Sequence, residues 1–376
     1  MQSALVPRGS LNTFVRNHKV GPMDTISLAD IKKQVALLQV AESYFDSVVL
    51  FALFETGVFK TLSSGPKTFE EIQQHVRGNE ESLRAALDAA VALGVLTRRE
   101  ARYAASETVL DCLGREQSPA YLGEWVAFLH ALATPLLQLG QVIRTGKAPG
   151  TFFEETEGDN SPAKRMTAAM DAYARTRGVE IVDHLDFTQA RHLLDVGCGP
   201  GTYSMAIVER NPHVRATLLD LPGPIAEARQ LAAARGMADR LDFVDVDARE
   251  YAPAQPFDTV LVSNILHLIG PRDSVELLKR CYRWLTPGGR VIVQAQFLND
   301  ERTSPRWPTL LNLTQRVASA KGRNHAFSET KQWMEDAGFT NIEYVRFSIW
   351  NVNSCLIGVR PTIASDRTNG PINTGN

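Results

Sequence analysis

The pattern of apolar and polar positions predicts mainly helices in the first part of the chain. The stretch Ser47–Leu62 is apolar on nearly all sides, which indicates a helix buried between neighbours or between subunits. Thr68 and Asn79 are typical N-caps, and each precedes a short amphipathic helix with acids in its first turn. The second of these helices ends before Gly94, and Val95–Ala105 then has the pattern of a basic β-ribbon. The order of three helices and a ribbon is typical of a winged helix.

A different pattern begins near residue 192, where short apolar runs alternate with segments of helical period. Two longer helices are predicted before it, at Tyr121–Thr145 and Ala163–Leu185. The expected strands are Leu193–Val196, Ala216–Leu219, Leu241–Ala248, Phe257–Ser263, Arg290–Phe297, Ile342–Phe347 and Ser354–Val359. The expected helices between them are Tyr203–Val208, Val275–Leu285 and Lys331–Ala337, with a turn at Pro287–Gly289. This alternation predicts an α/β domain built on a largely parallel sheet.

Composition and charge fit a soluble enzyme of two or three domains. The chain has 376 residues and a formal charge of -2, which gives no electrostatic argument for nucleic acid. Its four cysteines lie far apart and indicate reduced thiols in a cytoplasmic protein. No uninterrupted apolar run approaches the ~18 residues of a membrane span. Leu5–Ser10 matches a thrombin cleavage site, so residues 1–10 are expected to be a tag; residues 1–25 and 361–376 are expected to lie outside the fold.

The most informative segment is a glycine-rich turn after the first predicted strand of the α/β domain. Gly197, Gly199 and Gly201 would let a ligand approach the backbone at the N-terminus of the next helix, where free N–H groups favour a negative group. Asp220 ends the next apolar run, where doubly wound folds hold ribose hydroxyls. A dinucleotide fingerprint reads Gly-x-Gly-x-x-Gly, whereas here the third glycine comes one residue earlier and Asp195 precedes the first by two.

This turn resembles the first motif of class I S-adenosylmethionine-dependent methyltransferases, and NAD is the alternative cofactor. The resemblance implies a seven-stranded Rossmann-like core with a reversed final strand. It also implies that an acid after the third strand takes the adenine amino group; Asp247 is the candidate and Asp245 the alternative. The cofactor residues predicted on this basis are Asp195, Gly197, Gly199, Gly201, Asp220, Leu221, Asp247, Ala248 and Ser263.

The order of elements over residues 36–360 resembles the small-molecule O-methyltransferases of plant caffeate and bacterial antibiotic pathways. The resemblance implies a winged-helix-like dimerisation domain (26–120), a helical connector (121–186), an S-adenosylmethionine-binding catalytic domain (187–360) and a homodimer. Because transcription factors also use the winged helix, a DNA-binding regulator is the alternative function. Apart from Arg84, the would-be recognition helix 80–93 carries acids and apolar residues, which argues against DNA.

His267, four residues after Ser263, stands where this family carries its general base. An imidazole with a pKa near neutrality can take the proton of a hydroxyl acceptor. In plant relatives an Asp follows this His and a Glu lies on the next strand, whereas this chain has Leu268 and Ala295. Carbon or nitrogen methylation through alignment alone, and a non-methylating relative, therefore stay open as alternatives.

The acceptor pocket is expected to be apolar and to bind a small aromatic or polyketide-like metabolite. Relatives line this cavity with connector helices and the segment after the fifth strand. The residues predicted on this basis are Trp125, Phe128, Met166, Met170, Tyr173, Phe297, Trp307, Leu311 and Asn312. No metal site is expected, since Asp242, Asp245 and Asp247 crowd one strand without an open octahedral set.

Overall fold

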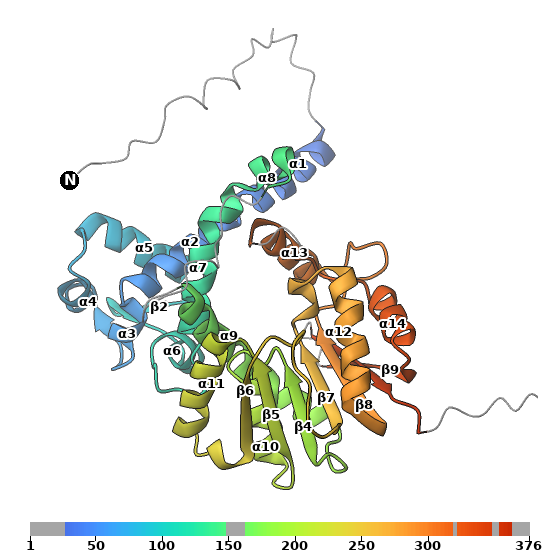
Figure 1. Cartoon of the computed structure of the whole chain (residues 1–376). Coiled ribbons are helices and arrows are strands. Elements are labelled where there is room, and N and C mark those ends of the chain that lie inside the picture. The colour runs from blue at the N-terminus through green and yellow to red at the C-terminus, as the bar shows by residue number, and fades with distance from the viewer. Residues whose placement is uncertain (1–26, 148–161, 319–321, 348–352, 363–376) are drawn as a thin grey trace, which may run out of the picture. The chain divides into compact units, whose positions relative to one another are not determined.

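The computed structural model describes residues 27–147, 162–318, 322–347 and 353–362. The predicted tag and nearly all of the predicted C-terminal tail lie outside these ranges. The described residues fall into two compact units, one ending at Leu50 and the other beginning at Phe51. Figure 1 shows the helices and strands of both.

The first unit contains α1 (Leu28–Glu42) and the start of α2 (Tyr44–Glu55). Ser27 caps α1 by accepting a hydrogen bond from the Asp30 N–H at 3.1 Å. None of the α1 side chains is buried in the single chain, and several of its large apolar residues are more than half exposed. By length and composition alone, Leu28–Glu55 is also apolar enough to cross a membrane. Exposed apolar surface of this extent is typical of an interaction site.

The predicted helix Ser47–Leu62 is wrong as a single element. The chain forms α2 and then α3 (Val58–Leu62), with a break at Gly57, whose φ of +77° lies in the left-handed region. The apolar pattern runs through the break because Val58, Phe59 and Leu62 are buried on the far side of it.

The caps predicted at Thr68 and Asn79 are confirmed, and so is the ribbon. Helices α4 (Phe69–Val76) and α5 (Glu80–Ala92) follow these residues, with a complete capping box between Thr68 and Glu71. Strands β2 (Thr97–Arg99) and β3 (Arg102–Ala104) form the ribbon, and β1 (Lys67–Thr68), which the pattern did not predict, pairs with β3.

The connector is helical as predicted, but the predicted helix Tyr121–Thr145 is wrong as a single element. After α6 (Glu107–Leu113) come α7 (Gly123–Leu137), α8 (Leu139–Thr145) and the long α9 (Pro162–His184). Helices α7 and α8 form a pair bent by 49°. Helix α9 packs against α7, α10 and α11, so it joins the helical part to the sheet.

The large sheet has seven strands in the order β6-β5-β4-β7-β8-β10-β9. The strands are β4 (His192–Val196), β5 (Arg215–Asp220), β6 (Leu241–Asp245), β7 (Phe257–Ser263), β8 (Leu285–Ala295), β9 (Thr340–Arg346) and β10 (Ser354–Val359). Strands β4 to β8 are parallel, and β10 runs antiparallel to both of its neighbours. The predicted seven-stranded core with a reversed final strand is confirmed.

Helices cover both faces of this sheet (Figure 1). One hydrophobic cluster joins the sheet to α9, α10 (Thr202–Arg210) and α11 (Pro222–Ala234), and the other joins it to α12 (Pro271–Trp284) and α14 (Phe327–Asp336). Neighbouring residues of β4 alternate between the two clusters, Leu193 in the first and Leu194 in the second. Both faces are therefore dry, which explains why the strands are continuous apolar runs.

Several predicted boundaries are wrong, among them the start of α12 at Pro271 rather than Val275 and the end of β6 at Asp245 rather than Ala248. The predicted turn Pro287–Gly289 lies within β8, where the pairing partners of Phe257 and Thr259 are Leu285 and Arg290, so the turn forms a bulge. Helix α14 begins at Phe327 rather than Lys331, because Glu329 accepts a hydrogen bond from the Ala326 N–H at 3.4 Å and supports an earlier start.

Candidate functional site

The glycine turn lies between the end of β4 and the start of α10. Gly197, Gly199 and Gly201 have φ values of +67°, +54° and +75°, a conformation that side chains rarely adopt. A Cβ atom on Gly197 would lie 2.1 Å from a methyl group of Ile265, whereas one on Gly199 would meet nothing within 4 Å. The turn therefore packs against Ile265 at Gly197, whereas the space beside Gly199 is open to a ligand.

Asp220, the last residue of β5, fixes this turn. Its two carboxylate oxygens accept hydrogen bonds from the N–H groups of Gly199 and Leu221, each at 2.7 Å. Burial raises the pKa of Asp220, and these two hydrogen bonds oppose the rise. The carboxylate that the sequence assigned to ribose hydroxyls therefore also ties two adjacent loops together.

Asp247 lies two residues beyond the end of β6 and lines a pocket at this edge of the sheet. Asp245 is exposed on the strand. The Asp247 carboxylate accepts hydrogen bonds from the Arg249 side chain at 2.5 to 3.0 Å. These bonds lower the pKa of Asp247. The ionised acid thus stands at the pocket edge, paired with a guanidinium that is 81% exposed.

A pocket of about 650 Å³ lies at the carboxyl ends of β4, β5 and β6. Among its lining residues are five that the sequence predicted: Gly197, Asp220, Leu221, Asp247 and Ala248. The sequence reading missed the opposite wall, which consists of Ile265, Leu268, Ile269, Arg272, Asp273, Glu276, Leu277 and Arg280. The sequence could have indicated this wall, because it predicts a helix after the fourth strand, whose carboxyl end lies at the same sheet edge.

The other predicted cofactor residues, Asp195, Gly199, Gly201 and Ser263, are not among those that line the pocket. Asp195 is 1% exposed, and one of its oxygens accepts a hydrogen bond from the Ser204 hydroxyl at 2.6 Å. Burial raises the pKa of Asp195 to about 7, the Ser204 bond opposes the rise, and the charge of Asp220 adds to it. Ser263 ends β7 and accepts a hydrogen bond from the Asn264 amide at 3.2 Å.

His267 lies on a single 3-10 turn, η2 (Leu266–Leu268), just beyond β7. Burial, with a smaller contribution from the nearby His325, lowers the pKa of His267 to about 4. Two contacts fix the backbone of this turn: the Arg323 N–H donates to the His267 carbonyl at 2.9 Å, and a ring nitrogen of His325 lies 3.0 Å from the Leu266 carbonyl. The backbone of the turn is therefore held in place, and the imidazole is neutral at physiological pH.

A carboxylate beside His325 is that of Glu329, which the sequence reading did not select. It lies 3.7 Å from His325 and forms ion pairs with Arg302 and Arg323. Its charge is therefore shared with two guanidinium groups rather than directed at His267.

The predicted acceptor residues come from α7, α9, the segment after β8, and α13 (Arg306–Ala318), which packs against α7. The rings of Trp125 and Phe128 are 5.4 Å apart, and those of Trp125 and Tyr173 are 4.5 Å apart. The Tyr173 hydroxyl accepts a hydrogen bond from Gln296 at 2.8 Å. These contacts form a continuous aromatic wall with one polar end.

The other predicted acceptor residues flank this wall. Phe297 is buried and Met166 and Met170 are half-buried, whereas Trp307 is 38% exposed. Asn312 accepts a hydrogen bond from the Asn324 N–H at 2.8 Å.

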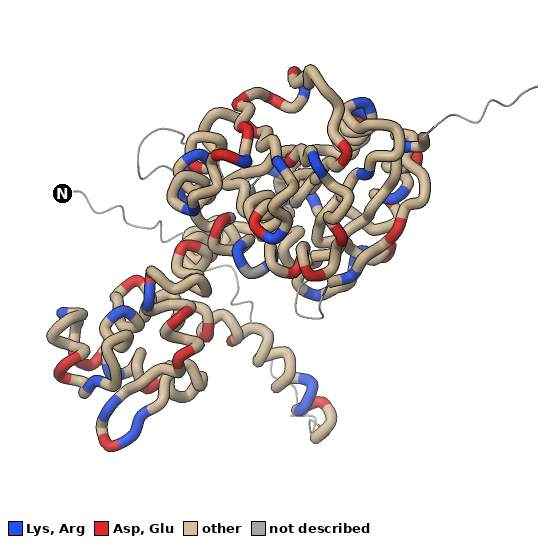
Figure 2. Tube along the Cα trace, turned by 90° about the horizontal axis from the view of Figure 1, so that it is seen from below, with Lys and Arg blue, Asp and Glu red and all other residues tan. Residues whose placement is uncertain are grey.

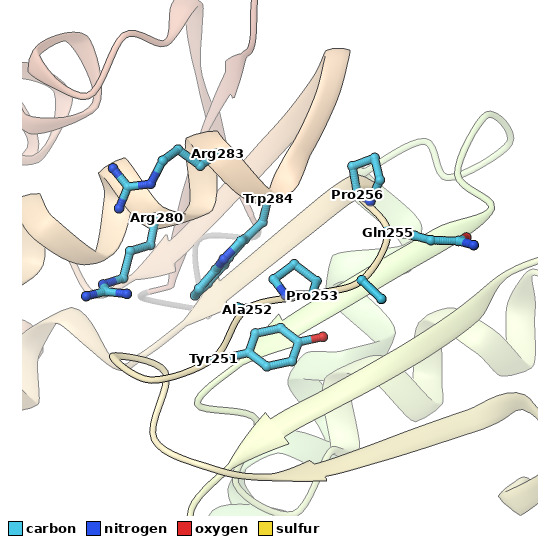
Figure 3. Close-up of a pocket in the computed structure, with 9 residues that line it drawn as sticks. Tyr251, Ala252, Pro253, Gln255, Pro256, Arg280, Arg283 and Trp284 are labelled. Carbon is cyan, nitrogen blue, oxygen red and sulfur yellow. The ribbon is translucent and has the colours of Figure 1, made fainter.

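A second pocket, of about 370 Å³, lies between the loop 251–256 and the end of α12 (Figure 3). It shares Arg280 with the first pocket and is lined by no residue that the sequence selected for chemistry. In Figure 3 the Arg280 and Arg283 side chains extend away from the loop prolines, so the two cations do not converge on this space.

Several basic residues of the winged-helix-like region are paired with acids. Arg98 contacts Asp88 and Arg102 contacts Glu71, each at 3.1 Å. Figure 2 shows basic and acidic positions interspersed along this part of the trace. Across the described residues there is also no group of three or more His, Cys, Asp or Glu side chains arranged to hold a metal ion.

Comparison with known proteins identifies two matching family models. One is described as an O-methyltransferase domain and matches residues 130–340, and the other is described as an O-methyltransferase dimerisation domain and matches residues 38–109.

Relatives and solved structures match over most of the chain. The tetracenomycin polyketide synthesis 8-O-methyl transferase TcmO of Streptomyces glaucescens is 29% identical over 86% of this chain and 96% of its own length. The N,N-dimethyltransferase OxyT of Streptomyces rimosus is 26% identical over 90% of this chain and its full length. Human N-acetylserotonin methyltransferase, solved with SAM, has the same fold, with a TM-score of 0.79 and 20% identity over 90% of this chain and all of that chain.

Proposed function

Because this chain belongs to the O-methyltransferase family, whose members use S-adenosylmethionine, we propose that it methylates a hydroxyl group of a small aromatic or polyketide-like metabolite. The observation that carries the proposal is the joint position of the cofactor-type pocket, with Asp220 and Asp247 on its wall, and the His267 turn at the same sheet edge. TcmO, which acts on a polyketide, supports the acceptor class.

The residues of the pocket fit the cofactor. Asp220 offers carboxylate oxygens for ribose hydroxyls, Asp247 offers an acceptor for the adenine amino group, and the open side of Gly199 leaves room for the amino acid end. When bound, S-adenosylmethionine supplies an electrophilic methyl group on a sulfonium sulfur. Asp195 acts from outside the pocket lining, holding the first turn of α10 through Ser204.

In the proposed mechanism, His267 takes the proton of the acceptor hydroxyl as the oxygen attacks the methyl group. A neutral imidazole is required, and the lowered pKa of His267 keeps it neutral above pH ~5. A pKa of about 4 also makes the ring a weak base, so the reaction favours an acidic phenol or enol over an aliphatic alcohol. The aromatic wall of Trp125, Phe128 and Tyr173 orients such a flat acceptor by packing.

Methylation of a nitrogen through alignment alone is a second candidate. Two observations favour it: Leu268 and Ala295 occupy positions where plant relatives have acids, and OxyT is an N,N-dimethyltransferase. A free amine needs no general base before attack, so this reaction would tolerate the loss of His267.

We further propose that the protein is a cytoplasmic homodimer. The dimerisation-domain match covers residues 38–109, and the exposed apolar surface of α1 and the start of α2 provides area for a second copy. All four cysteines are free thiols, as a reducing compartment requires. Light scattering of the full chain should give twice the monomer mass of 41.5 kDa, and a monomer at micromolar concentration would contradict this.

The test begins with calorimetric titration of S-adenosylmethionine and S-adenosylhomocysteine, with NAD as the control. Micromolar binding of the sulfur ligands alone is expected. Hydroxylated naphthoates and anthraquinones, each matched with its amino analogue, are then incubated with methyl-labelled cofactor. Transfer to the hydroxy compounds supports the proposal, transfer only to the amines supports the second candidate, and transfer to neither refutes both for this acceptor class.

A further inference from the structure

A buried carboxylate on α9 links the acceptor side of the site to the cofactor side. Asp171 is 8% exposed and lies between Met170 and Tyr173, two residues of the predicted acceptor wall. Its Oδ1 atom accepts a hydrogen bond from the Thr202 hydroxyl at 2.5 Å. Thr202 is the first residue of α10 and directly follows Gly201, the last glycine of the turn.

Two arginines neutralise this carboxylate and extend the link to further elements. Arg235, at the end of α11, donates to Oδ1 at 2.9 Å, and Arg175, one turn along α9, lies 3.6 Å from Oδ2. Arg175 also donates to the Tyr121 carbonyl at 2.6 Å, just before α7. Asp171, Thr202, Arg175 and Arg235 thus link α9, α10 and α11, and the hydrogen bond from Arg175 to Tyr121 adds the segment before α7.

The helix contact beside this cluster is unusually close. A Cβ atom on Gly178 of α9 would lie 3.1 Å from the Ala206 methyl group of α10. The two backbones are therefore closer than a side chain at residue 178 would readily allow. A shift of α9 therefore has to be passed to α10 and, through Thr202, to the glycine turn.

We propose that Asp171 is a positioning residue that fixes the acceptor wall of α9 relative to the methyl donor held by the glycine turn. Methyl transfer is an in-line displacement, and a misplacement of about 1 Å can lower the rate by about 100-fold. Asp171 touches neither reactant; it acts through Thr202 and through the helix that carries Met170 and Tyr173. This inference rests on the proposed function only for the location of the acceptor.

The primary test uses S-adenosylhomocysteine as the probe and hydrogen–deuterium exchange as the readout. In the unmodified protein, saturation with this ligand should slow exchange both in residues 197–204 and in residues 166–173. In Asp171→Asn the protection of 197–204 should remain, while the protection of 166–173 should fall at least threefold. The control is Asp183→Asn on the same helix, whose 48% exposed carboxylate lies 3.5 Å from Arg210 of α10; it should behave as the unmodified protein.

Equal α9 protection in Asp171→Asn and the unmodified protein would overturn the proposal, as would an absence of α9 protection in the unmodified protein. Thr202→Val, which removes the donor but leaves the arginine pairs, gives the same test if Asp171→Asn does not fold. With an acceptor in hand, Asp171→Asn should lower kcat by 10- to 100-fold and change the dissociation constant of S-adenosylhomocysteine less than threefold; an unchanged kcat would also overturn it. If no acceptor is methylated, the proposed function fails while the exchange data still decide the role of Asp171.

Discussion

Asp195→Asn should remove a pH-dependent loss of stability that the native carboxyl group causes. Burial raises the pKa of Asp195 from 3.8 to about 7, and its Oδ1 atom has no hydrogen-bond partner within the described residues. In the unfolded chain this carboxyl group releases its proton near pH 3.8, whereas the folded protein keeps it until about pH 7. The folded state thus binds the proton more tightly, and stability falls as pH rises through this window.

The magnitude follows from the width of that window. One pKa unit corresponds to about 1.4 kcal/mol, so the whole window costs the folded state about 4 kcal/mol and the part above pH 5.5 about 2 kcal/mol. Above pH 7 both states are ionised and the loss is constant. The asparagine variant keeps the acceptor for the Ser204 hydroxyl and does not titrate.

The assay is urea unfolding of both proteins at pH 5.5 and pH 8.5. Relative to the asparagine variant, the unmodified protein should lose about 2 kcal/mol of unfolding free energy between the two pH values. Asp242→Asn, at a carboxylate that is 63% exposed on the next strand but one, serves as the control and should show no such difference. A difference between Asp195→Asn and the unmodified protein that stays constant within about 0.5 kcal/mol across this range would refute the reasoning.

Four further outcomes are expected. Asp220→Ala should weaken S-adenosylhomocysteine binding at least 100-fold in calorimetry, because both oxygens of Asp220 accept backbone N–H groups of the cofactor turns; unchanged affinity would remove it from the site. His267→Ala should lower methyl transfer to a phenol by about 10²–10⁴-fold with cofactor affinity retained. In the native enzyme kcat/KM should fall only as pH drops through about 4, where His267 gains its proton. A decrease of kcat/KM centred near pH 6.5 would show that the His267 ring is not desolvated. Gly201→Ala should lower the free energy of unfolding by about 1–3 kcal/mol, since its φ is +75° and its Cβ would lie 2.6 Å from Leu218; an unchanged Tm would contradict this.

The order and type of the elements could be predicted from the sequence because they depend on local patterns. Continuous apolar runs specified β4, β5 and β7, and the N-caps at Thr68 and Asn79 specified where two helices begin. The break at Gly57 escaped prediction, since the apolar pattern continues through it and only packing shows where the backbone must turn. At Pro287–Gly289 the sequence predicted a turn, but the bulge within β8 follows from the pairing with β7.

The pocket wall formed at the ends of β4, β5 and β6 was determined by the sequence itself, because the carboxyl ends of adjacent parallel strands meet at one edge. Gly197, Asp220 and Asp247 therefore had to come together. The tertiary structure alone decided what faces them: the α12 wall of the pocket, the burial that lowers the pKa of His267, and the contact between Asp171 and Thr202. These features depend on which helices pack against one another across long separations in sequence, and desolvation and close contact arise only once that packing exists.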